Sequence, residues 1–303
     1  MSKLRLAFCW QGVSDKKIYE HWKDGLFAAI QLIKKDHEVV FNEPWDEIKD
    51  VDVILYWEAP VTAQGQNAPH YNKVRSNPIK KILLFAGGPI NPDWIKGFDL
   101  LLLESKVNEK ECDDWGIPWQ HAFGINTDIF NPLNLKKKYK AICFGTCASW
   151  KRQGLFGIAL KSDGVVCGRG QESDGEPFRE CARNNVTMFG ELPYEEVNKL
   201  VNESHCSVNC ASEWGGGQRQ TLESLAAGIP VICMTDSPKN REFVEESGCG
   251  LVVKPEEEEI RKAVEEVMSW TDEKKKSGIK YVREKFSHEI YAQQILKGIQ
   301  SIL

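Results

Sequence analysis

The sequence lacks any uninterrupted apolar run of the roughly 20 residues that a membrane-spanning helix needs, although 42% of its 303 residues are hydrophobic. Its net charge is only −5, which provides no overall basic surface for nucleic acid or for an anionic membrane. The apolar stretch near the start is too short for a signal peptide before charged residues resume. We therefore expect a cytoplasmic protein without a transmembrane segment, for which peripheral membrane contact stays open.

The sequence also lacks the spacing of a structural metal site, despite its ten cysteines. Cys143 and Cys147, like Cys206 and Cys210, have three residues between them rather than two, and no histidine pair follows at zinc-finger spacing. Most cysteines stand inside apolar runs such as AICFG and PVICM, which predicts buried, reduced thiols. We expect no metal ion and no cofactor.

A complete dinucleotide fingerprint is missing as well. Gly168, Arg169 and Gly170 follow a predicted strand, but the third glycine of the fingerprint does not follow at the required spacing. This argues against a nicotinamide-dependent oxidoreductase. We interpret the three residues as a turn after a strand.

Hydrophobic patterns that alternate between strands and helices run through both halves of the chain, which predicts an α/β fold with doubly wound sheets. In the first half we expect strands at 4–10, 37–41, 51–57, 79–85 and 98–103 and a helix at 15–35. In the second half we expect strands at 141–144, 164–167, 186–189, 206–209, 231–234 and 250–253. The helices expected there cover 152–160, 194–202, 220–227, 239–245, 256–270 and 287–303.

The stretch from Asn209 to Gly250 has the pattern of a phosphate-binding turn. Gly215, Gly216 and Gly217 permit a tight turn, and a helix is predicted directly afterwards. Free N–H groups and the helix dipole suit a diphosphate at such a helix start. Glu213 and Glu223 flank the loop, which is an arrangement that a nucleotide sugar needs.

These residues resemble the retaining glycosyltransferases of family 4, which have the GT-B fold. The matching string is Glu213, Gly215 and then LESLAAGIPV at 222–231. Three further segments are similar to the family at 116–132, 184–192 and 241–253. Glu213 and Glu223 stand two positions further apart than the family's two glutamates usually do, and Thr221 takes the usual position.

The resemblance implies two Rossmann-like domains that face each other across a cleft. It places an acceptor-side domain at 1–132, a donor-binding domain at 133–286, and at 287–303 a helix that returns to the first domain. The segment 131–140, with its lysine cluster, is the expected linker. The cluster is either a solvated hinge or a basic contact to an anionic acceptor.

The implied catalytic residues are Glu213, which hydrogen-bonds the sugar, and Lys151, which neutralises the diphosphate. Glu223 is expected to accept hydrogen bonds from the ribose. Thr146 stands where the family has an arginine, so either Arg152 or Arg219 substitutes for that arginine or the activity is altered. The expected donor-binding residues are Glu223, Arg219, Gly215, Gly216, Gly217, Gln218, Gln220, Thr221, Gly190, Thr146 and Arg152.

The acceptor side is less defined by the sequence. Many family members have a histidine near the end of one first-domain strand, and here that strand reads KKILLFAGGPI. Gly12, Gly87 and Gly88 are the expected acceptor-side positions. We predict transfer of a sugar from a nucleoside diphosphate, with retention, to a glycan, lipid, protein or modified nucleobase. The alternative is a non-catalytic protein that binds sugar nucleotides.

Overall fold

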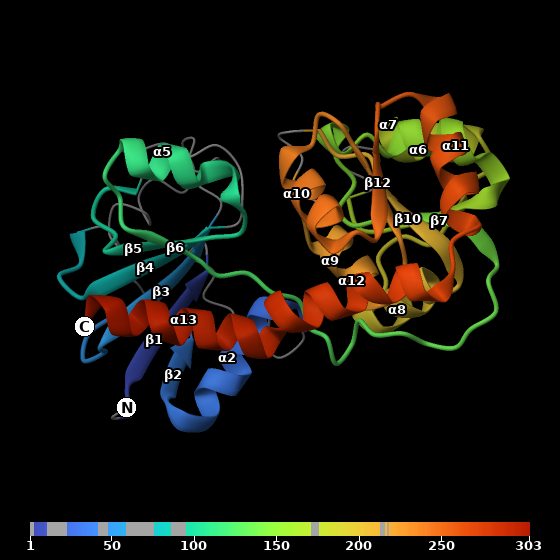
Figure 1. Ribbon diagram of the computed structural model, residues 1–303. Helices are drawn as coiled ribbons and strands as arrows, with labels where there is room; N and C mark the ends of the chain where they lie inside the picture. Colours follow the sequence, from blue (N-terminus) through green and yellow to red (C-terminus); the bar gives the residue numbers. More distant parts are fainter. Residues whose placement is uncertain are drawn as a thin grey trace. The chain divides into compact units, whose positions relative to one another are not determined.

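The computed structural model describes residues 3–10, 23–41, 48–58, 76–85, 95–170, 176–212, 216 and 218–303. The chain forms two compact units (Figure 1). Unit 1 contains Met1–Gly124 and His288–Leu303, and unit 2 contains Ile125–Ser287. Residues 125–132, which the sequence analysis places with the first domain, are thus grouped with unit 2.

Unit 1 is built on a six-stranded sheet with the order β2-β1-β3-β4-β5-β6, in which all neighbouring strands are parallel. Its strands are β1 (Arg5–Trp10), β2 (Glu38–Phe41), β3 (Val53–Glu58), β4 (Lys80–Phe85), β5 (Leu100–Leu103) and β6 (Trp119–His121). Its described helices are α2 (Gly25–Asp36), η2 (Lys106–Asn108), α5 (Glu109–Asp114) and α13 (His288–Ile302).

Helices cover both faces of this sheet. α2 and α13 lie side by side on one face, where Phe8, Leu55 and Ile295 are fully buried together (Figure 1). α5 lies on the opposite face, where Cys112 packs in the same cluster as Tyr56. α13 reaches the sheet closely, as its Gly298 leaves only 2.9 Å between an added Cβ and the side chain of Leu100. The last helix of the chain therefore completes the core of unit 1.

Unit 2 repeats this architecture with a second parallel sheet of six strands, in the order β12-β11-β10-β7-β8-β9. Its strands are β7 (Tyr139–Phe144), β8 (Gly164–Cys167), β9 (Thr187–Met188), β10 (Ser204–Asn209), β11 (Val231–Met234) and β12 (Gly250–Val253). Its helices are η3 (Ser149–Lys151), α6 (Gln153–Leu160), η4 (Lys161–Asp163), α7 (Glu176–Arg183), α8 (Tyr194–Asn202), α9 (Gln218–Ala226), α10 (Pro238–Ser247), α11 (Glu257–Met268) and α12 (Asp272–Lys285).

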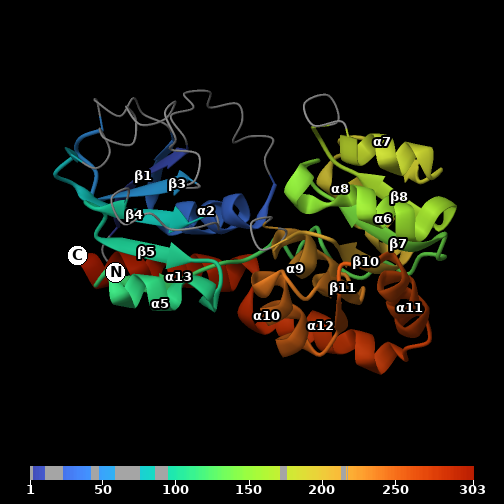
Figure 2. The same cartoon turned by 90° about the horizontal axis from the view of Figure 1, so that it is seen from above.

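The core of unit 2 also lies on both sides of its sheet (Figure 2). α6, α7 and α11 pack against one face, and α8 with the end of α9 packs against the other. α12 covers the outside of α9. Both sheets are therefore doubly wound, and the α/β fold class expected from the sequence is confirmed.

Most predicted elements are present with small shifts at their ends. β8, β11, β12 and α8 have the predicted bounds. The sequence analysis missed β6, α5, α7 and α12, because these are short or strongly charged segments with a weak apolar period. In addition, the first part of the helix predicted at 15–35 falls outside the described residues.

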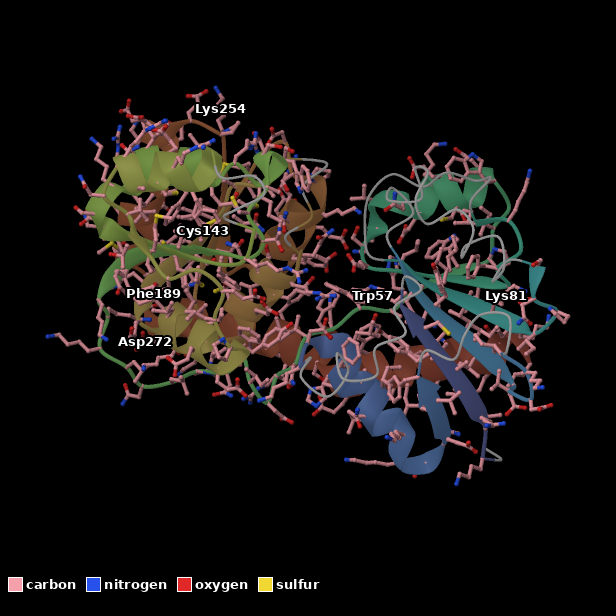
Figure 3. All side chains as sticks on the ribbon, turned by 180° about the vertical axis from the view of Figure 1, so that it is seen from behind. Trp57, Lys81, Cys143, Phe189, Lys254 and Asp272 are labelled. Atoms are coloured by element: carbon pink, nitrogen blue, oxygen red, sulfur yellow. The ribbon has the colours of Figure 1, made fainter. Side chains whose placement is uncertain are left out.

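All ten cysteines are free and buried, as the sequence analysis predicts. Cys143, for example, lies inside unit 2 (Figure 3). Burial raises the pKa of Cys167 and of Cys210 to about 12, so both thiols are protonated at neutral pH. Within the described part of the chain, no helix combines the length and the apolar character that crossing a membrane requires.

The expected linker at 131–140 is bonded to unit 2. The Lys137 ammonium donates to the carbonyls of Asn202 at 2.8 Å and Ser204 at 2.7 Å, and desolvation lowers its pKa to about 8. Lys138 pairs with Glu203 at 2.6 Å. The segment is therefore no free hinge, and these lysines have partners within the protein itself.

Candidate functional site

The topology of unit 2 defines where a ligand can bind. From β7 the chain continues to β8 and β9 on one side, whereas β10, β11 and β12 continue on the other side. Ligands of doubly wound sheets bind outside the carboxyl ends of the strands at this switch point. Here the loops after β7 and β10 meet, and the N–H of Ser212 donates to the carbonyl of Trp150 at 3.0 Å.

Lys151 lies at this switch point, in the short helix η3 that follows β7. Its ammonium lies 3.4 Å from the position that a Cβ on Gly145 would occupy, so it lies over the backbone at the end of β7. The side chain is only partly exposed. In the portion of the chain that the structure describes, this ammonium makes no hydrogen bond or ion pair.

The charges around Lys151 are mostly of its own sign. Desolvation lowers the pKa of Lys151. Cys143 and Glu223 raise this pKa, whereas Arg219 and Arg169 lower it further. A bound anion would raise the pKa of Lys151 again, because a nearby opposite charge favours the protonated amine. The site thus has the electrostatic character of an anion-binding site.

Helix α9 supplies Arg219 and Glu223 to the same neighbourhood. Arg219 is partly exposed in the first turn, and Glu223 is buried one turn later with 6% of its surface exposed. Among the described residues, the buried amide nitrogen of Gln218 has no hydrogen-bond partner. The start of α9 therefore has an amide donor available to a ligand, beside the free N–H groups of its first turn.

Two predicted donor-binding side chains on α9 are directed into the protein instead. The Gln220 amide donates to the Ser207 hydroxyl at 3.2 Å and to the Val208 carbonyl at 3.0 Å. The Thr221 hydroxyl, which is fully buried, donates to the Asn240 side chain at 2.8 Å. Their geometry favours a role in holding α9 against β10.

Thr221 belongs to a buried polar network that the sequence analysis missed. Asn209, at the end of β10, donates to Thr221 and to Asn240 at 3.0 Å each. Asn240, on α10, donates in turn to the carbonyl of Gly216 at 3.0 Å and to Ser237 at 2.8 Å. This network holds the backbone carbonyl of Gly216. A polar residue that ends an apolar strand, as Asn209 does, is the signal that could have revealed it.

Arg152 is engaged elsewhere. Its guanidinium donates to both carboxylate oxygens of Asp236, at 2.8 and 2.7 Å, and to the carbonyl of Cys210 at 2.7 Å. The hydrogen bonds from Arg152 lower the pKa of Asp236. Arg152 therefore links the loops that follow β7, β10 and β11, and its guanidinium is engaged within the protein.

The loops after β8 and β9 complete the carboxyl edge of the sheet. Gly190 has a positive φ of 63°, and its carbonyl accepts a hydrogen bond of 2.6 Å from the N–H of Gly168. Thr146 is exposed in the loop after β7. Both predicted residues thus lie on the edge that carries Lys151.

The structure brings together three of the predicted site residues, Lys151, Arg219 and Glu223. Other predicted positions lie outside the described residues, namely Glu213, Gly215, Gly217, Gly12, Gly87 and Gly88. In unit 1, the switch point lies between β1 and β3. The loops that follow these two strands are likewise outside the described part.

Comparison with known proteins gives one family and many similar structures. The family described as Glycosyl transferases group 1 matches residues 164–285, which lie within unit 2. No curated protein sequence matches the chain.

Solved structures are similar over almost the entire chain. A sucrose-phosphate synthase from Thermosynechococcus elongatus has a TM-score of 0.74 at 14% identity and covers 99% of both chains. A glycosyltransferase from Rickettsia africae has a TM-score of 0.74 at 13% identity, with 100% of this chain and 99% of that one covered. The Anabaena protein HepE, solved in complex with UDP and glucose, has a TM-score of 0.72 at 11% identity and covers 98% and 100%. The chain therefore has the GT-B fold of two Rossmann-like domains, and residues 164–285 of its second unit match the family Glycosyl transferases group 1.

Proposed function

We propose that this protein is a glycosyltransferase that moves a sugar from a nucleoside-diphosphate sugar to an acceptor with retention of configuration. One observation carries the proposal. The Lys151 ammonium lies at the switch point of a parallel sheet, beside Arg219 and Arg169, without a hydrogen bond or ion pair to any described residue. A diphosphate would meet these cations and the N–H groups at the start of α9 together, which supports binding of the donor here.

In the proposed reaction, the bond between the anomeric carbon and the phosphate oxygen breaks, and its electron pair stays on the diphosphate. Lys151 and Arg219 stabilise the charge that develops there. The acceptor oxygen bonds to the anomeric carbon from the same face, and its proton passes to the departing diphosphate. Glu223 accepts hydrogen bonds from the ribose, and Glu213 accepts them from the sugar hydroxyls.

The proposal needs no metal ion or cofactor, because side-chain cations and helix N–H groups meet the charge of the diphosphate. HepE was solved with UDP, which makes uridine nucleotides the first donors to test. The acceptor is left open among glycans, lipids, proteins and modified nucleobases.

A non-catalytic sugar-nucleotide-binding protein is the second candidate, and Thr146 favours it. This exposed residue is neutral and lies on the edge that carries Lys151. A site with fewer cations can bind a nucleotide yet stabilise the departing diphosphate less well.

One experiment separates the two candidates. The protein is incubated with UDP-, GDP- and ADP-sugars, and thermal stabilisation is recorded beside release of the nucleoside diphosphate with EDTA present. Stabilisation together with release that Lys151→Met abolishes supports the transferase, since a bound ligand stabilises the folded state. Stabilisation without release, across a broad acceptor panel, supports the binding protein. If no nucleotide sugar has any effect, both proposals are wrong.

A further inference from the structure

The turn after β8 is fixed against the loop that carries Thr146. The N–H of Gly145 donates to the carbonyl of Cys167 at 3.0 Å, and the N–H of Cys147 donates to the carbonyl of Arg169 at 2.7 Å. Gly168 has a φ of 148°, and an added Cβ would lie 1.8 Å from the Gly145 carbonyl oxygen. Only glycine fits there. The backbone of Arg169 is therefore held beside the loop after β7.

The side chain of Arg169 extends from this fixed backbone into an exposed position. Its guanidinium makes neither a hydrogen bond nor an ion pair with any residue that the structure describes. It is nevertheless close enough to Lys151 to lower the pKa of that amine. Like charges repel, and Glu223 offsets the repulsion only in part, so this arrangement favours an anion close to both cations.

The charges at the site also favour an anion near Arg169. Lys151 and Arg219 supply two positive charges, and the buried carboxylate of Glu223 partly offsets them. Arg152 is fully engaged with Asp236 and Cys210, and Thr146 is neutral. Arg169 is a further cation at this edge. Its guanidinium makes no hydrogen bond or ion pair with any described residue.

We propose that Arg169 binds the diphosphate of the donor from the turn after β8, opposite Lys151. This inference rests on the proposed function, since it assigns a further residue to the same donor site. Arginine suits the role because its planar guanidinium donates two parallel hydrogen bonds to phosphate oxygens.

The test compares Arg169→Gln with Arg183→Gln. Arg183 is exposed on the same unit and pairs with Glu180 at 3.0 Å, which makes it a matched control for loss of one positive charge. Calorimetry measures binding of UDP, GDP and ADP, of their nucleosides, and of inorganic pyrophosphate at one ionic strength. For the nucleotide that the parent binds most tightly, we expect Arg169→Gln to lose about tenfold in affinity.

Two features make the expected result specific to phosphate. Binding of the nucleoside should be unchanged in Arg169→Gln, and Arg169→Lys should retain part of the affinity for the diphosphate, because lysine keeps the positive charge but not the two parallel hydrogen bonds. Thr146→Arg in the Arg169→Gln background should restore part of it, because the Thr146 methyl group lies 3.6 Å from the Cβ position of Gly170.

Three results would overturn the assignment. Equal affinity of Arg169→Gln and the parent shows that Arg169 does not touch the phosphates. An equal loss for the nucleoside shows that the variant acts through the turn's structure. An equal loss in Arg183→Gln shows a general charge effect. A parent that binds none of the nucleotides contradicts the proposed function itself, and the inference with it.

Discussion

Arg152 and Asp236 form a two-pronged ion pair in unit 2, with Nη1–Oδ2 at 2.8 Å and Nη2–Oδ1 at 2.7 Å. Arg152 has a positive φ of 50°, an unfavourable conformation for a residue other than glycine. The ion pair and the bond to the Cys210 carbonyl stabilise this conformation. The pair thus orders the loop from which Lys151 extends.

Arg152→Gln should lower the free energy of unfolding by about 1–2 kcal/mol near pH 7. The ion pair should account for about 0.5–1 kcal/mol of this loss, because Asp236 is partly exposed and solvent screens the pair. Arg152 lowers the pKa of Asp236, so the pair stabilises the fold above the carboxyl's unfolded pKa of about 4. The stabilisation by the ion pair is lost as the pH falls through the lower pKa that Asp236 has in the folded protein. Urea unfolding of both proteins between pH 7 and pH 3 measures it, and a difference that does not change with pH contradicts the assignment.

Lys151→Met should weaken nucleoside diphosphate binding by about ten- to a hundredfold, because a charge-assisted hydrogen bond contributes roughly 1.5–3 kcal/mol. The same variant should be more stable than the parent at pH 7, since folding removes the ammonium from water and lowers its pKa. This gain should disappear as the pH rises toward 10.5, where the amine is neutral in both states. Lys161→Met, an exposed change in η4, is the control. Equal affinities for parent and Lys151→Met would place the phosphates elsewhere.

The two glutamates should affect different steps. Glu223→Ala should weaken binding of the nucleoside and of the nucleoside diphosphate alike, because the proposed partner of Glu223 is the ribose. Glu213→Ala should instead abolish sugar transfer while the affinity for free nucleoside diphosphate is kept, since its proposed partner is the sugar. Calorimetry and turnover with the same donor measure both effects. Normal turnover in Glu213→Ala, or normal nucleoside affinity in Glu223→Ala, contradicts the respective role.

Asn240→Ala should destabilise unit 2 by about 2–4 kcal/mol, because the change removes the acceptor of two buried hydrogen bonds, one from Asn209 and one from Thr221. The change also removes the hydrogen bond to the Gly216 carbonyl, so nucleotide affinity should fall because this part of the backbone is no longer held in place. Arg241→Gln on the same helix removes an exposed pair with Glu245 and a long hydrogen bond of 3.5 Å to the Thr235 carbonyl, and it should cost less than about 0.5 kcal/mol. Thermal unfolding ranks the two variants. A similar loss in both would show that the network contributes little.

The chain passes between the units after Gly124 and returns after Ser287. The N–H of Ile125 donates to the carbonyl of Phe286 at 2.8 Å, and Ile125 pairs with Ser287, so the two passages lie side by side. Only these two adjacent passages connect the units covalently, which permits rotation. Small-angle scattering should therefore show a smaller radius of gyration at saturating UDP, without the change in Lys151→Met. A constant radius would indicate a fixed arrangement.

The sequence alone determined the strands and the longer amphipathic helices of both sheets. An apolar run or a helical period reports burial directly, and β8, β11, β12 and α8 were predicted to the residue for this reason. It also pointed to Arg219 and Glu223, because a glycine loop before a helix start is a local pattern with a local chemical consequence, and to Lys151 through the family resemblance.

The tertiary structure decided which polar side chains are free to meet a ligand. Gln220 and Thr221 follow the glycine loop in sequence, yet their side chains turn toward β10 and α10. Arg152 stands next to Lys151, yet its partner Asp236 comes from the loop after β11. Such pairings join residues that are far apart in the chain, and only the strand order of the sheet brings them together. The same strand order places Arg169 beside Lys151, which no spacing in the sequence could indicate.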